Sequence, residues 1–280
     1  MTDATDVTHG SDLSTFEFDG GSLVYRDTGE GRPLVLLHGG FLDHRMWRDQ
    51  IPFLVRDHRV IAPDARGHGG SSVARAAFRH TDDLAALLRH LGTGPAILVG
   101  LSMGGATAVD TALEHPDLVS ALVVSGAGTS EPDFRDPWVK GIQAELTRAF
   151  TEGDADGYVE AFTQYAPGPR RALDEVDQDV VRLLREMTAN TVAKHTGAVP
   201  AELLPVADTW ARAAQLTLPA FAINGGVDSA DCIGMAERLV HSIPGGRAVT
   251  VDGVAHYPNM ERPGTFNEIL GGFLRTLPSR

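Results

Sequence analysis

The sequence predicts an α/β fold, with an eight-stranded, mostly parallel sheet flanked by helices and a helical lid inserted after the sixth strand. Three observations predict it. Short apolar runs alternate with helical patterns along most of the chain. The later runs are mostly continuous, as in strands that are buried on both faces of a parallel sheet. One long stretch then interrupts the alternation without a strand of its own. The 280 residues suit one large domain of this kind.

Eight segments have the pattern of strands, and the first two form a hairpin that turns at Gly20-Gly21. The expected strands are 16–18, 23–25, 34–37, 60–62, 96–99, 119–124, 220–223 and 248–251. Helical spacing between them predicts helices at 82–91 and at 106–114, the second of which stops before Pro116. In such a sheet the functional loops lie at the carboxyl ends of the strands, so a site is expected there.

The segment 130–215 carries helical patterns and no strand, and we interpret it as a lid over the strand ends. An ordinary pair of peripheral helices is the alternative. Helices within the segment are expected at 142–150, 158–165 and 176–187. The sheet and its helices are then divided into 15–129 and 216–280, and residues 1–14, which are acidic and polar, are expected to form a disordered tail.

Composition excludes several classes of partner. The net charge of −13 argues against nucleic acid and anionic membrane, because both select for basic surfaces. The first residues lack the basic start and apolar stretch of a signal peptide, and the apolar runs are too short to span a membrane. The lone cysteine, Cys232, cannot form a disulfide within the chain, so we expect a cytoplasmic protein. Cys232 is interpreted as small buried filler, since no Cys/His motif surrounds it. The oligomeric state stays open, with a homodimer as one alternative.

Residues 98–105 read LVGLSMGG, an apolar strand that runs into Gly-x-Ser-x-Gly and then into a helix of small residues. This order places a serine on a strained strand-to-helix turn, where its hydroxyl can act as a nucleophile. The pentapeptide can also arise by chance. A nucleophilic Ser102 needs a base, an acid that orients the base, and an oxyanion hole.

His256 is the predicted base, because it follows the last strand and therefore lies at the same sheet edge as Ser102. His38, at the end of the third strand, is the other serious candidate, although loop architecture is its expected role. His195, within the predicted lid, could face the pocket.

Asp228, which follows the seventh strand, is the predicted partner for the second nitrogen of His256. Asp231 is the second choice. Asp252 lies close to His256 in the sequence. It stands at the end of a strand, however, where an aspartate ordinarily caps the backbone. The resulting chain order is serine, aspartate, histidine.

The oxyanion needs two preorganised donors. One is the backbone N–H of Met103, the residue after the nucleophile. The other is expected in the glycine loop after the third strand, with Gly40 as first choice and Phe41 as second.

With these residues in place, the chain resembles the α/β-hydrolase superfamily over residues 16–278. Five motifs carry the resemblance in the right order. They are Leu36-Leu37-His38-Gly39-Gly40 with Trp47 downstream, Ala62-Pro63-Asp64-Ala65-Arg66-Gly67-His68-Gly69-Gly70-Ser71, Gly100-Leu101-Ser102-Met103-Gly104-Gly105, Asn224-Gly225-Gly226-Val227-Asp228, and Gly253-Val254-Ala255-His256-Tyr257-Pro258-Asn259-Met260-Glu261-Arg262-Pro263.

The resemblance implies the α/β-hydrolase fold and a serine, aspartate and histidine triad. Within the superfamily the chain is similar to the small-ester and lactone group, which includes enol-lactone hydrolases and cofactor-free perhydrolases. Haloalkane dehalogenases and epoxide hydrolases are disfavoured, because they use a carboxylate at the position of Ser102. One departure is Ala255, where the family usually has glycine.

The expected activity is hydrolysis of a small carboxylic ester or lactone through an acyl-enzyme on Ser102, a reaction that needs no metal or organic cofactor. Two alternatives stay open. The same triad can serve carbon–carbon bond hydrolysis, lyase, perhydrolase or acyl-transfer chemistry in secondary metabolism, or the chain can be a retired hydrolase that only binds. Five lid residues are candidates to line the pocket, namely Phe134, Trp138, Phe162, Tyr165 and Met187, and each could equally belong to the lid core.

Overall fold

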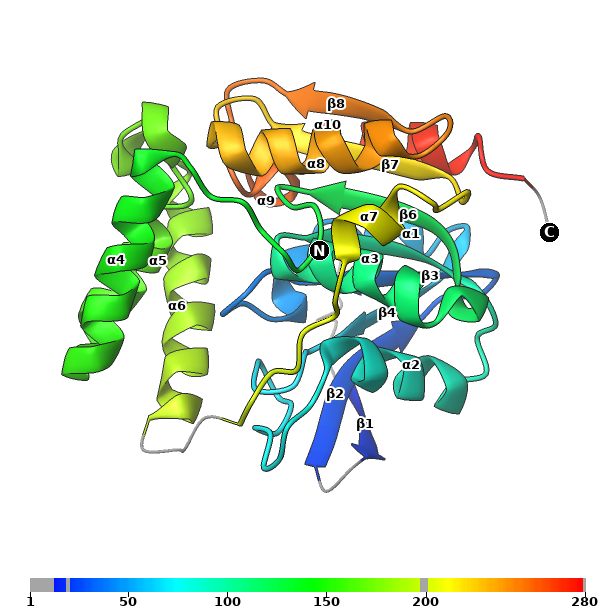
Figure 1. Cartoon of the computed structure of the whole chain (residues 1–280), viewed down its shortest axis with the longest axis horizontal. Helices are drawn as coiled ribbons and strands as arrows, with labels where there is room; N and C mark the ends of the chain where they lie inside the picture. Colours follow the sequence, from blue (N-terminus) through cyan, green and yellow to red (C-terminus); the bar gives the residue numbers. More distant parts are fainter. Residues whose placement is uncertain (1–12, 19–20, 197–200, 279–280) are drawn as a thin grey trace, which may run out of the picture.

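The chain forms one eight-stranded sheet with helices on both faces (Figure 1). The computed structural model describes residues 13–18, 21–196 and 201–278. The strands are β1 (Leu13–Phe18), β2 (Gly21–Thr28), β3 (Arg32–Leu37), β4 (His58–Pro63), β5 (Ala96–Leu101), β6 (Val119–Ser125), β7 (Ala220–Gly225) and β8 (Arg247–Val251). They lie in the order β1-β2-β4-β3-β5-β6-β7-β8. Only the β1–β2 and β2–β4 pairs are antiparallel, which confirms the predicted mostly parallel sheet.

The two faces of the sheet are covered by different helices. In β3, Val35 and Leu37 face α2, α3 and α8, whereas Leu34 and Leu36 face α1, α9 and α10. Because side chains alternate along a strand, a strand that is covered on both faces reads as a continuous apolar run. The helices of the sheet layers are α1 (Ile51–Leu54), α2 (His80–His90), α3 (Met103–Glu114), α7 (Thr209–Ala213), α8 (Ala230–Ser242), α9 (Pro258–Glu261) and α10 (Pro263–Leu274). Short 3-10 helices add η1 (His44–Trp47), η2 (Pro116–Leu118), η3 (Gly168–Arg170) and η4 (Leu173–Glu175).

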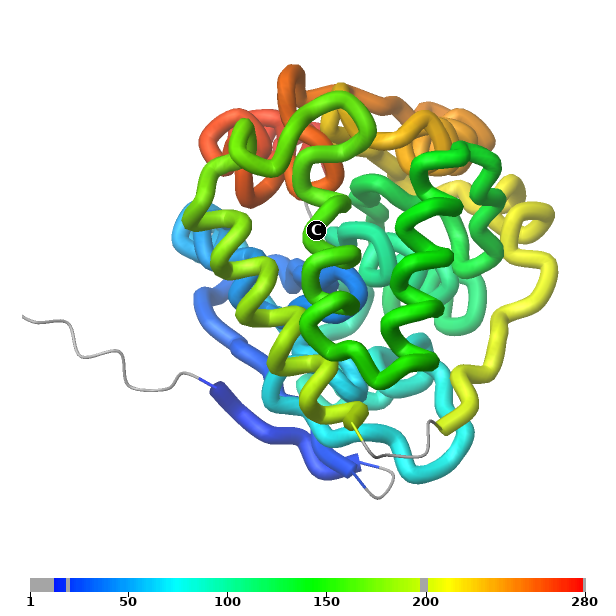
Figure 2. Tube along the Cα trace, turned by 90° about the vertical axis from the view of Figure 1, so that its left-hand side faces the viewer, coloured from blue at the N-terminus to red at the C-terminus, as the bar shows by residue number. Residues whose placement is uncertain are grey.

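Three further helices stand together beside the sheet, on the left of Figure 1 and in front in Figure 2. They are α4 (Pro137–Glu152), α5 (Ala155–Thr163) and α6 (Gln178–His195). The apolar side of α6, with Val180, Val181, Leu184 and Met187, joins the core that lies on the α9 and α10 face. We call α4, α5 and α6 the lid helices, after the predicted lid segment in which they lie.

The end of the predicted lid segment returns to the body of the molecule. Leu203 forms a parallel β-bridge with Phe78, and Ala213 of α7 is buried in the core together with residues of α3 and α8. The helices that stand apart from the sheet therefore occupy 137–195, a narrower range than 130–215.

The predicted tail lies outside the described residues as far as residue 12, and Leu13 and Ser14 belong to β1. Of the helices that the structure describes, none has the length and apolar character needed to cross a membrane.

Candidate active site

Ser102 lies between β5 and α3 in a conformation that few side chains adopt, with φ +53° and ψ −117°. Its N–H donates to the carbonyl of Ser125 on the neighbouring strand β6 at 2.8 Å, and its carbonyl accepts from Ala106 in α3 at 3.0 Å. Hydrogen bonds on both sides therefore hold the turn. Such a strained serine at a strand-to-helix turn has its hydroxyl exposed at the sheet edge.

The glycines on either side of Ser102 are needed for close backbone packing. A Cβ at Gly100 would collide with the carbonyl of Gly104, and a Cβ at Gly104 would collide with the carbonyl of Leu37 in β3. Any larger residue at either position would push the strand and helix apart. Close backbone packing therefore explains why glycine occupies both positions of the motif.

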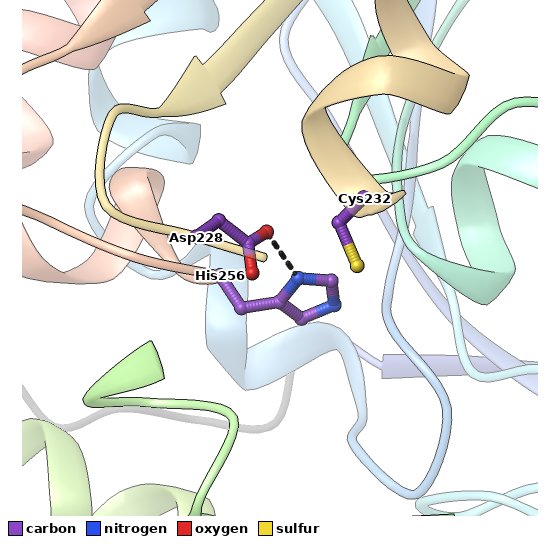
Figure 3. A group of neighbouring side chains, drawn as sticks. All are labelled: Asp228, Cys232 and His256. Atoms are coloured by element: carbon purple, nitrogen blue, oxygen red, sulfur yellow. Dashed lines mark hydrogen bonds and ion pairs between the residues drawn. The ribbon is translucent and has the colours of Figure 1, made fainter. Parts of the chain in front are cut away.

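Asp228 and His256 form a buried pair at the same sheet edge (Figure 3). The Nδ1 of His256 donates to Oδ2 of Asp228 at 2.7 Å, and Oδ1 of Asp228 accepts from the N–H of Ser229 at 2.7 Å. The exposed fractions are 1% for Asp228 and 4% for His256. This bond leaves Nε2 of His256 as the nitrogen that is able to accept a proton.

Close backbone contact brings the two loops of this pair together. Gly225, at the end of β7, lies so near the carbonyl of Ala255 that a Cβ would collide with it. The N–H of Val227 also donates to the carbonyl of Val254 at 3.0 Å. The loop after β8 is thus fixed against the loop that carries Asp228.

The pKa of His256 is set by opposing effects. Burial lowers it, whereas the negative charge and hydrogen bond of Asp228, with smaller contributions from Cys232, raise it, and the pKa lies above the ordinary value of 6.5. The rings of Tyr165 and Tyr257 lie 5.4 and 5.3 Å from the imidazole and complete its surroundings.

The glycine loop after β3 lies beside Met103. A Cβ on Gly40 would sit 3.8 Å from the Cβ of Met103, and Phe41 has φ +58°. Within the part of the chain that the structure describes, the backbone N–H groups of Gly40, Phe41 and Met103 donate to no partner. Met103 opens α3, where the first N–H groups have no carbonyl within the helix. Free donors at this place are what an oxyanion hole requires.

Ser102 and His256 line one cavity of about 380 Å³, together with Gly40, Phe41 and Met103. No hydrogen bond joins the Ser102 hydroxyl to the His256 ring in this structure, although both residues are described. In ligand-free enzymes such bonds are often long and tighten when substrate binds.

The alternative residues from the sequence are engaged elsewhere. His38 donates from Nδ1 to the carbonyl of Gly39 at 2.8 Å and accepts at Nε2 from the N–H of Ala65 at 2.9 Å, so both nitrogens support the loop. Asp231 accepts from the N–H groups of Arg135 and Asp136, both at 2.6 Å, at the start of the lid helices.

The last two alternatives also lie apart from the His256 ring. Asp252 is exposed. His195 contacts the carbonyl of Gly67 at 3.1 Å and lines two neighbouring cavities.

Three of the five predicted lid residues, Phe134, Phe162 and Tyr165, line the cavity of Ser102 and His256. Trp138 packs edge-on against Tyr165 at 5.8 Å, and Met187 is fully buried in the core. The sequence reasoning missed further lining residues, among them Gln143, Leu146, Tyr158, Cys232, Met235 and Tyr257. Cys232 is buried, as predicted, but beside the Asp228–His256 pair.

The sequence matches the family model described as alpha/beta hydrolase fold over residues 32–263, which is most of the chain. The chain belongs to the α/β-hydrolase fold family. The eight-stranded sheet and its flanking helices are those of this fold, as the sequence predicted.

Named esterases and a lactonase align with nearly the whole length of this α/β-hydrolase chain. A pimeloyl-[acyl-carrier protein] methyl ester esterase of Aeromonas hydrophila subsp. hydrophila is 30% identical over 88% of this chain and 96% of its own. A thermophilic esterase from Thermogutta terrifontis has a TM-score of 0.79 at 26% identity and covers 95% of this chain and 98% of its own. The enol-lactonase from Burkholderia xenovorans LB400 has a TM-score of 0.76 at 25% identity, with 94% of this chain and 100% of its own covered.

Ala255 leaves the loop of His256 intact. Its methyl group is buried and points to Gly168 in the lid segment, where a Cβ would lie 2.7 Å from it. The methyl group therefore contacts the lid segment, and Gly168 has the φ of +70° that glycine adopts readily.

Proposed function

We propose that the chain is a serine hydrolase that cleaves a small, neutral carboxylic ester or lactone through an acyl-enzyme on Ser102. The observation that carries the proposal is the buried 2.7 Å bond between His256 and Asp228, in the same sheet edge and beside the same cavity as Ser102. Membership in the α/β-hydrolase family, together with relatives that are named esterases and a lactonase, supports an enzyme of the carboxylic ester hydrolase type.

The reaction follows from the roles of these groups. The Oγ of Ser102 attacks the carbonyl carbon while Nε2 of His256 takes its proton, and Asp228 stabilises the imidazolium. The backbone N–H of Met103, with that of Gly40 or Phe41, donates to the oxyanion. His256 then protonates the leaving alcohol, and the acyl group stays on Ser102. Water attacks this ester, with His256 again as base, and releases the acid.

The cavity favours uncharged substrates. No lysine, arginine, aspartate or glutamate lines it among the described residues, and its walls are mainly aromatic, methionine, glycine and small side chains. A carboxylate on the substrate would lose its hydration there without gaining a cationic partner, which costs several kcal/mol if it stays charged. The net charge of −13 adds repulsion at long range.

A matched pair of esters tests both the reaction and this selectivity. We expect p-nitrophenyl hexanoate to be hydrolysed with a kcat/KM at least about tenfold above that of mono-p-nitrophenyl glutarate, a difference of ~1.4 kcal/mol or more. Initial rates of nitrophenolate release, corrected for the spontaneous rate of each ester, measure it. Equal values for the two esters would contradict a neutral-substrate site.

Product analysis separates the proposal from its alternatives. Recovery of a carboxylic acid and an alcohol in equal amounts from a simple alkyl ester supports hydrolysis. Carbon–carbon bond cleavage, lyase, perhydrolase or acyl-transfer chemistry would give other products, and a retired binding module would give none.

Phe41 is expected to limit the length of the acyl chain. Its ring packs against Tyr158 at 4.8 Å and Phe162 at 5.4 Å in α5. It also lines two cavities besides the catalytic one, of about 430 Å³ next to Phe150 and about 280 Å³ next to His68. The Phe41 side chain therefore lies between the cavity of Ser102 and these two further cavities.

Removing that side chain should extend the acyl pocket. We expect Phe41→Gly to raise the ratio of kcat/KM for p-nitrophenyl decanoate over butyrate by about tenfold, because apolar methylenes gain contacts in the joined cavities. Glycine also suits the φ of +58° at this position. Phe150→Gly is the matched control, since Phe150 is 64% exposed and lines the cavity of about 430 Å³ but not the one that contains Ser102. The same ratio in wild type and Phe41→Gly would show that Phe41 is no barrier.

A further inference from the structure

Cys232 lies next to the Asp228–His256 pair, in the first turn of α8 (Figure 3). A sulfur of Cys232, a ring nitrogen of His256 and a carboxylate oxygen of Asp228 all lie within 4.8 Å of one another. The three side chains are 3%, 4% and 1% exposed. Figure 3 shows the thiol pointing toward the imidazole from the side opposite Asp228.

Thiolate, imidazole and carboxylate are the three side-chain groups that bind Zn²⁺ in proteins, and three protein ligands with an open fourth position are a common arrangement. We propose that Asp228, Cys232 and His256 form a binding site for a thiophilic divalent cation such as Zn²⁺ or Cd²⁺, and that the bound cation inhibits the enzyme. The inhibition rests on the proposed function, whereas cation binding does not.

A modest movement completes the coordination. Ligand atoms around Zn²⁺ lie about 3.3 Å apart when each is about 2.0–2.2 Å from the metal. The 2.7 Å contact between Nδ1 of His256 and Oδ2 of Asp228 therefore has to open slightly, and the sulfur has to approach. Oδ1 of Asp228 keeps its bond from the N–H of Ser229.

Coordination explains the loss of activity. The cation takes the place of the proton between Nδ1 and Oδ2. That proton moves to Nε2 of His256, and the proton of the Cys232 thiol passes to solvent. With a proton on Nε2, His256 cannot accept the proton of Ser102. The cation thus blocks the base without touching the serine.

The cavity gives the cation access, because Cys232 and His256 both line it and no lysine or arginine does among the described residues. A second group of ligand atoms, Asp43, His44 and Asp64, is a weaker competitor. Both oxygens of Asp43 accept from Arg45, and both oxygens of Asp64 accept from backbone N–H groups. It also has no sulfur, the ligand that soft cations prefer.

Cd²⁺ titration of the full-length Ser102→Ala chain tests binding without any catalysis. The sequence has one cysteine, so the ultraviolet thiolate-to-cadmium charge-transfer band reports on Cys232 alone. We expect the band to saturate at one Cd²⁺ per chain and to be absent in Ser102→Ala/Cys232→Ala. Its absence from Ser102→Ala would overturn the site, whatever the esterase activity of the wild type.

Inhibition is measured on the active chain. We expect Zn²⁺ to inhibit wild-type hydrolysis, EDTA to restore it, and the half-inhibitory Zn²⁺ concentration to rise at least tenfold in Cys232→Ala. Each variant is compared with its own metal-free rate, and Cys232→Ser is a second variant of nearly the same volume. His44→Ala tests the competing group and should keep the wild-type sensitivity. Inhibition that is unchanged in both Cys232 variants would overturn the proposal.

Discussion

Replacing Ser102 with alanine is expected to lower kcat for p-nitrophenyl hexanoate by about 10⁴ to 10⁶-fold. Loss of the nucleophile removes the covalent route, while the oxyanion donors and the cavity leave a small residual rate over water. A fluorophosphonate probe should label the wild-type chain stoichiometrically and leave Ser102→Ala unlabelled. The variant should keep the circular dichroism spectrum and melting temperature of the wild type, because the hydroxyl makes no hydrogen bond that the structure describes.

Ser125→Ala is the matched control for this experiment. Ser125 lies at the end of β6, and its carbonyl accepts from the N–H of Ser102, a contact that alanine keeps. Its hydroxyl is buried and has no partner among the described residues, so its loss should change kcat by less than about twofold. Equal labelling of wild type and Ser102→Ala, or full activity in Ser102→Ala, would refute Ser102 as nucleophile.

The fold was predictable because the inner strands of the sheet are buried on both faces. Runs such as Ala96–Leu101 contain no polar side chain, and this pattern distinguishes an inner parallel strand from a surface one. The extent of the helical segment beside the sheet was less predictable. Residues 201–208 have no periodicity, and they meet the body through a β-bridge between Leu203 and Phe78, far apart in sequence, and through the buried side chain of Val206. Pairings of that kind leave no local signal.

The candidate triad could be assembled from chain order alone, because parallel strands bring their carboxyl ends to one edge. Its surroundings could not. Cys232 follows Asp228 by four residues, and Ser229 caps the helix with a bond from the N–H of Cys232 at 3.1 Å. Asp228 lies before this helix, so helical spacing alone does not place the thiol beside it. Met187, a candidate to line the pocket, lies in the core. The apolar face of α6 does not indicate in the sequence whether its side chains line a pocket or pack in the core.

Asp228→Asn is expected to lower kcat by about 10⁴-fold while leaving the fold intact. The amide can donate to Nδ1 of His256, which favours the tautomer with the proton on Nε2, and that tautomer cannot accept the proton of Ser102. The variant also removes the charge that stabilises the imidazolium. Steady-state kinetics on p-nitrophenyl hexanoate measure the loss.

The pH profile provides an independent readout of the same pair. Activity requires neutral His256, and the charge of Asp228 holds the pKa of His256 above 6.5, so wild-type kcat/KM should rise with pH through a midpoint above 6.5. In Asp228→Asn, burial acts without the opposing charge, and the midpoint of the residual activity should move to lower pH. A wild-type midpoint below 6.5, or a flat profile between about pH 5 and 8, would contradict His256 as the base.

Asp252→Asn makes the same chemical change four residues before His256. It separates the loss of the hydrogen-bonded carboxylate from a general loss of negative charge. Asp252 is exposed and is not the partner of His256 in the structure, so its loss should change kcat by less than about twofold and leave the midpoint in place. A general loss of negative charge would instead lower the midpoint in both variants. A shift confined to Asp228→Asn therefore assigns the raised pKa of His256 to one buried carboxylate, and with it the ability of His256 to hold the proton that Ser102 gives up.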